Sequence, residues 1–385
     1  MKTAVADITS SFLAIAAQPL SRERVRVFPK RFELFCLIVP AILVCLLILD
    51  KFTLQVLSSG SQSQQLNRFV TSLLFFNSIH VYFTFAYLLT VPEIKSWIRE
   101  ITDGRPWKFW LEILGVACVC SILTAIAFFN IGITSTSLPI ISVIFVGIIP
   151  YHHMIAQNFG LSMLYNSQLT KQVAHSEQEK IQTLKCSARE RLGFRCFMVF
   201  FFAWISVRMA GNALGLAPGL VSFFRHSLHL LTSGSVVFIF LNSLTYPHAS
   251  KSNKPVFLSR MLLYVVLPFT FIADSALRAC HGTEYLCVTG SVAKNSSMSK
   301  AIAKQYLGLL LLLASVGTVL LLCRKGDGLV AFLFDGQYSD VPISIQALAF
   351  VSIVATYTHY YLDRRLFRFR HKSNRDHVLP LLNGE

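Results

Sequence analysis

Histidines within apolar segments are the residues of this sequence best suited to chemistry. His80 lies in one long apolar run, His152 and His153 lie in another, and His248 and His359 lie near the ends of two more. Ionisable side chains inside membrane-spanning segments are costly and usually face the interior of a helix bundle. Neutral imidazole is a good metal ligand and can also carry protons. These histidines therefore predict a shared site within a membrane.

Polar residues accompany these histidines at helical spacing. Thr84 and Tyr87 share a predicted helical face with His80, and Asp363 follows His359 by four positions. A carboxylate at that spacing is suited to orient an imidazole. Further hydrogen-bonding residues surround His153 and are the candidate catalytic or substrate-contacting residues: Tyr151, Gln157, Asn158 and Tyr165.

Metal binding is the chemistry that this group of residues predicts. Several imidazoles with one or two carboxylates favour iron, zinc, copper or manganese. The expected metal ligands are His80, His153, His248 and His359, with His152 and Asp363 as further members. Iron, as a single ion or a di-iron centre, is the expected cofactor, and zinc, copper and haem are the alternatives. The HxxxH and HxxHH motifs of membrane di-iron desaturases do not occur in the sequence.

A second polar group lies nearer the predicted outer side of the membrane. Arg208 lies deep in an apolar run, and Asp274 is its expected partner because a buried arginine requires an opposite charge. His226 and His229 lie on one helical face nearby. The group predicts a structural ion pair, an anion or headgroup site, or a proton path. His226 and His229 could also ligate a metal or haem.

The elements that position these residues are predicted to be membrane-spanning helices. The chain has 385 residues and is 54% hydrophobic but only 14% charged, whereas soluble domains carry about 25% charged residues. Runs of about 20 apolar residues are long enough to cross a bilayer. They occur at 33–52, 67–91, 108–130, 138–165, 194–216, 222–246, 256–277, 301–323 and 342–362. The expected fold class is an all-α polytopic transmembrane helical bundle of about 8–10 spans.

The chain is expected to form one membrane domain, 33–362, between a cytoplasmic N-terminal segment, 1–32, and a basic cytoplasmic tail, 363–385. A charged insert, 166–193, is expected to be an amphipathic or solvated helix. Lysine and arginine gather in alternate loops and in the tail, so the positive-inside rule places both termini in the cytoplasm of a multi-pass inner-membrane protein. The net charge of +16 then reflects these loops and anionic lipid, and not nucleic acid.

Two cysteines flank a polar stretch that is expected to be an outer loop. Cys280 and Cys287 are seven positions apart around it. In an oxidising compartment such a pair can form a disulfide, and the sequence leaves both states open.

Three segments of the chain resemble a group of poorly characterised bacterial polytopic membrane proteins. They are FFNSIHVYFTFAYLLTVPEIKSW, YHHMIAQNFGLSMLY and THYYLDRRLFRFR, which match a histidine-containing second span, a WHH..RQ.YG-like helix and an HY.(I/L)D-like helix. The resemblance implies importance, without a settled activity, for His80, His153, Gln157, Gly160, His359 and Asp363. A looser similarity to integral-membrane metal oxygenases concerns the chemistry alone.

The expected function is oxidation, desaturation or oxidative cleavage of a hydrophobic or lipid-like substrate by an iron-dependent membrane oxidoreductase. The sequence has no dinucleotide-binding glycine motif, so the electron donor would be a separate protein. Three alternatives stay open. One is a proton-coupled transporter that uses the histidines and an Arg208–Asp274 pair as a relay. The others are a membrane haem protein and a membrane anchor for a soluble partner.

Overall fold

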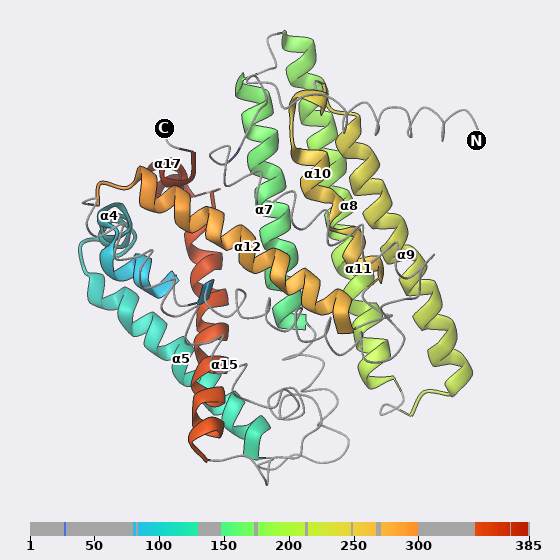
Figure 1. The fold of residues 1–385 in the computed structure, drawn as a ribbon, viewed down its shortest axis with the longest axis horizontal. Coiled ribbons are helices and arrows are strands. Elements are labelled where there is room, and N and C mark those ends of the chain that lie inside the picture. Colours follow the sequence, from blue (N-terminus) through green and yellow to red (C-terminus); the bar gives the residue numbers. More distant parts are fainter. Residues whose placement is uncertain are drawn as a thin grey trace, which may run out of the picture.

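The computed structural model describes residues 27, 80–81, 84–129, 148–172, 176–211, 215–247, 249–266, 271–298, 343–369 and 371–383. This part of the chain is helical and contains no strand (Figure 1). The all-α fold class is therefore confirmed. The apolar runs predicted at 33–52 and 301–323 lie outside the described residues.

The described helices differ widely in length. The long ones are α5 (Pro106–Phe129), α7 (Ile149–Gln172), α8 (Glu177–Ala210), α9 (Pro218–Leu244), α12 (Phe271–Asn295) and α15 (Ile343–Leu366). The short ones are α4 (Pro92–Ile101), η4 (Ala249–Lys251), α10 (Lys254–Ser259), α11 (Leu262–Val266), α16 (Lys372–His377) and α17 (Leu379–Asn383). Residues 84–90 are also helical and precede α4.

The charged segment 166–193 is divided between two long helices. Its first residues extend α7 to Gln172, and its later residues form the first half of α8. A capping box starts α8, because the Ser176 hydroxyl accepts from the Glu179 amide and the Glu179 carboxylate accepts from the Ser176 amide. The same helix then continues through the apolar residues 194–210. The charged and apolar segments are therefore parts of one 34-residue helix.

The apolar run 256–277 is not a single helix, and this expectation is wrong. The run is divided among α10, α11 and the start of α12. The predicted outer loop around Cys280 and Cys287 is instead the middle of α12. Both cysteines are buried within this helix. Seven residues of helix separate them by about 10 Å along the axis, which is too far for a disulfide.

The long helices form two groups joined by α12. Figure 1 shows α7, α8, α9, α10 and α11 on one side, α4, α5 and α15 on the other, and α12 extending between them. Helices α8 and α9 pack closely at Gly193, where a Cβ atom would lie 2.8 Å from Ile239 Cγ1. The candidate site lies among α7, α12 and α15, where the two groups meet.

Two of the described helices are long and apolar enough to cross a membrane. They are the Pro106–Ala125 part of α5 and the whole of α9, Pro218–Leu244. Both expose large apolar side chains, including Leu111, Val119 and Ile122 on α5 and Phe223 and Leu230 on α9. Such contiguous apolar surfaces mark membrane or protein contacts, so the structure supports membrane association.

Candidate metal centre

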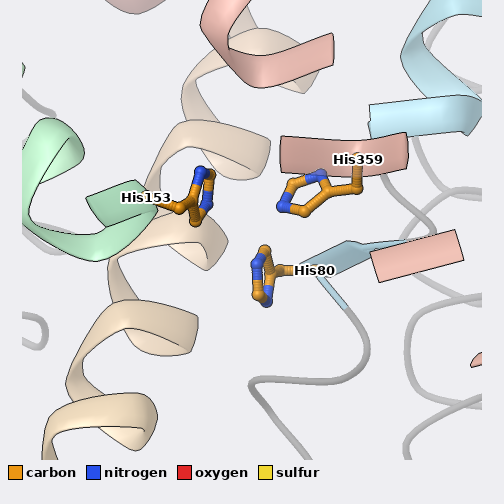
Figure 2. Close-up of side chains that lie close together, drawn as sticks. All are labelled: His80, His153 and His359. Carbon is orange, nitrogen blue, oxygen red and sulfur yellow. The ribbon is translucent and has the colours of Figure 1, made fainter. Parts of the chain in front are cut away.

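Three of the predicted histidines come together in the structure (Figure 2). His80 precedes the 84–90 helix, His153 lies on α7 and His359 lies on α15. One possible ligand atom from each lies within 4.8 Å of the others, and all three side chains are buried. Segments that are far apart in the sequence therefore present imidazoles to one point.

Asp363 adds a carboxylate to this trio of histidines. Its Oδ2 atom lies 3.4 Å from His359 Nε2 and 3.7 Å from His153 Nε2. These three atoms are buried, and none has a hydrogen-bond partner among the described residues. Buried polar atoms nearly always have a partner. Two imidazole nitrogens and a carboxylate oxygen facing one another are a site that a cation would satisfy.

Hydrogen bonds from Thr84 determine how His359 and Asp363 are presented. The Thr84 hydroxyl donates to Asp363 Oδ1 (3.0 Å), and Thr84 Oγ1 lies 2.8 Å from His359 Nδ1. With its only proton directed to Asp363, the hydroxyl accepts from the Nδ1–H of His359. Nε2 of His359 then carries the lone pair, as a metal ligand requires. Tyr285 on α12 also donates to Asp363 Oδ1, at 2.8 Å.

A fourth histidine, His281 on α12, lies beside the trio and was not predicted. Its Nε2 atom lies 3.2 Å from His80 Nε2, and its ring centroid lies 4.6 Å from that of His80 and 4.9 Å from that of His153. Sequence reasoning placed this residue in an outer loop because the segment is rich in polar side chains. The available signal was helical spacing, since His281, Tyr285 and Val288 share one buried face.

Gln157 and Asn158 connect α7 to a neighbouring ion pair. Gln157 Nε2 donates to Glu284 Oε2 at 2.9 Å, and Asn158 accepts from Arg260 and donates to Tyr264 Oη at 3.2 Å. Arg260 and Glu284 form a buried ion pair. The side-chain amides of these two predicted catalytic residues therefore connect α7 to α11 and α12.

The other predicted residues near His153 pack against aromatic side chains of other helices. His152 stacks on Phe202, with ring centroids 6.1 Å apart. Tyr151 meets Phe201 edge-on at 5.3 Å, and Tyr165 lies 5.8 Å from Phe257. His152 is thus directed towards α8, about 100° around the helix from His153.

The described members of the predicted outer group do not lie with the three histidines of the candidate metal centre. Arg208 is exposed and lies over the Trp204 ring, 5.4 Å from its centroid. His226 Nδ1 donates to the Ser222 carbonyl at 2.7 Å, and His229 Nε2 donates to the Val265 carbonyl at 3.0 Å. The Asp274 side chain and His248 lie outside the described residues, so the Arg208–Asp274 pair and a His248 ligand stay predictions.

A second buried polar network joins α7, α8 and α10, and it was not predicted. Lys254 forms an ion pair with Glu190 and donates to Asn166, and Tyr246 donates to Glu190 at 2.6 Å. Burial lowers the pKa of Lys254 to about 8, although the Glu190 carboxylate acts in the opposite direction. All four side chains are buried, and hydrogen bonds and an ion pair connect them. Such a fully satisfied buried network stabilises the packing of the helices that it joins.

No protein-family model matches this chain, and neither a curated protein nor a solved structure is similar to it. Its function must therefore be inferred from the chemistry of the site.

Proposed function

We propose that this protein is a multi-pass membrane oxidoreductase that uses iron to oxidise a hydrophobic, lipid-like substrate. The iron would be held by His80, His153 and His359, with Asp363 as a ligand or orienting group. The observation that carries the proposal is the convergence of three buried histidines beside Asp363. Among the described residues, His153 Nε2, His359 Nε2 and Asp363 Oδ2 have no hydrogen-bond partner. A membrane location with both termini in the cytoplasm belongs to the same proposal.

The geometry favours one ion. Two ligand atoms that each lie about 2.1 Å from an ion are at most about 4.2 Å apart, and the ligand atoms of the trio lie within 4.8 Å. Small rotations of the rings would close this difference. A di-iron centre holds two ions about 3.5–4 Å apart and would need more carboxylates than Asp363 alone. Histidines with one carboxylate are the donor set of non-haem iron oxygenases.

The protein's own residues would orient the ligands and exclude water from the metal. Thr84 and Tyr285 hold Asp363 through hydrogen bonds, and Thr84 sets the tautomer of His359. Bound iron would supply the oxygen and redox chemistry that side chains lack. The site is fully enclosed at His359, which is 0% exposed. Enclosure of this kind keeps water away from the reacting groups.

A proton-coupled transporter is the second candidate. The buried pairs Lys254–Glu190 and Arg260–Glu284 favour it, because ionisable residues inside membrane bundles often form proton relays. In that case the four histidines would exchange protons and would hold no metal.

Metal analysis of the detergent-purified protein separates these candidates. We expect about one iron per chain in the wild type and a loss of most of it in His359→Ala, because a buried ligand is removed. His226→Ala is the matched control, since His226 is exposed and bonds its own helix. Zinc in place of iron would contradict the redox proposal. A metal-free wild type with histidine-dependent proton flux in liposomes would establish the transporter.

A further inference from the structure

The imidazole of His281 occupies the same kind of position in the candidate metal centre as that of His359. The centroid of the His359 ring lies 4.7 Å from that of His80 and 5.2 Å from that of His153. The centroid of the His281 ring lies 4.6 Å and 4.9 Å from the same two rings. All four contacts are edge to face, and all four side chains are buried. The described histidines therefore form a closed quartet of imidazoles.

The distance between His281 and His80 fits two ligands of one ion. Ligand atoms that each lie about 2.1 Å from an ion, at angles of about 90–110°, are about 3.0–3.4 Å apart. His281 Nε2 lies 3.2 Å from His80 Nε2. On the opposite side of the quartet, His359 Nε2 lies 3.4 Å from Asp363 Oδ2. Both pairs of atoms thus have the separation of adjacent ligands.

Helix α12 is attached on two sides in a way that directs His281 towards this point. Glu284, three residues after His281, accepts from Gln157 of α7 at 2.9 Å. Tyr285, four residues after His281, donates to Asp363 of α15 at 2.8 Å. Residues three and four positions apart lie on one face of a helix. The contacts that hold α12 against α7 and α15 therefore turn His281 to the same side.

We propose that His281 is a metal ligand, so that four histidines and Asp363 hold a single ion. Neutral imidazole offers one lone pair to a metal, and the quartet would offer four. The proposal rests on the proposed function for the presence of a metal, but it holds for zinc as well as for iron, since imidazole binds both.

This ligand set also restricts the class of substrate. Five protein ligands leave one position on an octahedral ion, whereas a site of two histidines and one carboxylate keeps several positions open. One position is enough for a small molecule, but a substrate that must bind the metal through two atoms is excluded. A hydrocarbon chain has no ligand atom and would lie beside the ion. The ligand set therefore fits the apolar substrate of the proposed function.

X-ray absorption spectroscopy of the full chain, purified in detergent and loaded with Fe²⁺, tests this ligand set by counting the imidazoles bound to the metal. We expect four in the wild type and three in His281→Gln. Glutamine can keep a hydrogen bond to His80 but does not supply an imidazole ligand. His152→Gln is the matched control, because His152 stacks on Phe202 of α8, and it should keep all four.

Titration with Fe²⁺ gives a second measurement on the same proteins. His281→Gln should weaken binding by at least about 100-fold, since groups that only orient a ligand already contribute about 10–100-fold. The affinity of His152→Gln should equal that of the wild type. If His281 only forms a hydrogen bond with His80, His281→Gln would keep both the imidazole count and the affinity of the wild type.

The outcomes separate this inference from the proposed function. Three imidazoles in the wild type, or an unchanged count in His281→Gln, would overturn the assignment of His281 and keep the other ligands. The count in the wild type decides this even if His281→Gln does not fold. Zinc bound by four imidazoles in the protein as purified would overturn the redox function and keep His281 as a ligand. A protein that binds no metal would overturn both.

Discussion

Thr84 shows how much a single hydroxyl can determine at this site. It lies between His359, Asp363 and Tyr285, from two other helices. Its contacts orient one imidazole and one carboxylate that would otherwise have rotational freedom. Groups that hold metal ligands in this way affect affinity nearly as strongly as the ligands themselves.

Thr84→Val should weaken metal binding by about 10–100-fold, because His359 loses its Nδ1 partner and Asp363 loses a donor. Titration of the metal-depleted protein with Fe²⁺ would measure the change. Thr90→Val is the control, since Thr90 lies in the same helix and donates to the Ala86 carbonyl of that helix. Equal affinity in Thr84→Val and the wild type would show that this hydroxyl does not orient the ligands.

Close helix contacts determine whether the elements can bring these residues together. Helices α8 and α9 pack backbone to side chain at Gly193, and α7 is joined to α8 and α10 by the Lys254–Glu190 network. The network holds α7, which carries His153, and the Gly193 contact positions α8, on which α7 packs. Changes at either position should therefore act on stability before they act on metal binding.

Gly193→Ala should lower the free energy of unfolding by about 1–3 kcal/mol, because the new methyl group would overlap Ile239 and Phe238. Gly234→Ala on α9 provides the comparison, since no described residue beyond its own stretch of helix has an atom within 4 Å of the point that its new methyl group would occupy. That variant should gain up to about 1 kcal/mol from helix propensity. Melting curves in detergent would test both, and a neutral Gly193→Ala would argue against close packing of α8 on α9.

Lys254→Met should destabilise the protein by about 3–5 kcal/mol, because Glu190 would stay buried without its counter-charge. The double variant Lys254→Met with Glu190→Gln removes both charges and should recover part of this loss. Thermal unfolding of the single and double variants measures the coupling. Purely additive losses would mean that the two side chains do not interact.

At the scale of the whole molecule, the candidate metal centre joins two groups of helices. His153 and His281 come from α7 and α12, whereas His359 and Asp363 come from α15, which packs on α5. An ion at this point would link them and would stabilise the folded state. The exposed apolar side chains of α5 and α9 provide the surface that lipid would cover.

Removal of the metal by a chelator should therefore lower the melting temperature of the wild type. Ligand binding stabilises a fold by about 2.7 kcal/mol when the free ligand is at 100 times its dissociation constant. In His359→Ala the same chelator should have no effect, because no ion is bound there to remove. An equal response of both proteins would point to a general effect of the chelator and would contradict metal-linked stability.

Composition and helical periodicity, which are properties of the sequence alone, determined the helical class and placed Thr84 on the same face as His80, and Asp363 one turn after His359. These are local relations, and spacing along a helix is enough to establish them. The sequence led us to expect that His80, His153 and His359 lie together, but only the packing of separate helices decides whether they do. Packing also brought in His281, because the segment around it has no long apolar run that would mark it as a membrane span. It likewise directed Gln157 and Asn158 to Arg260 and Glu284, since the partners of a helical face depend on which helices lie against it.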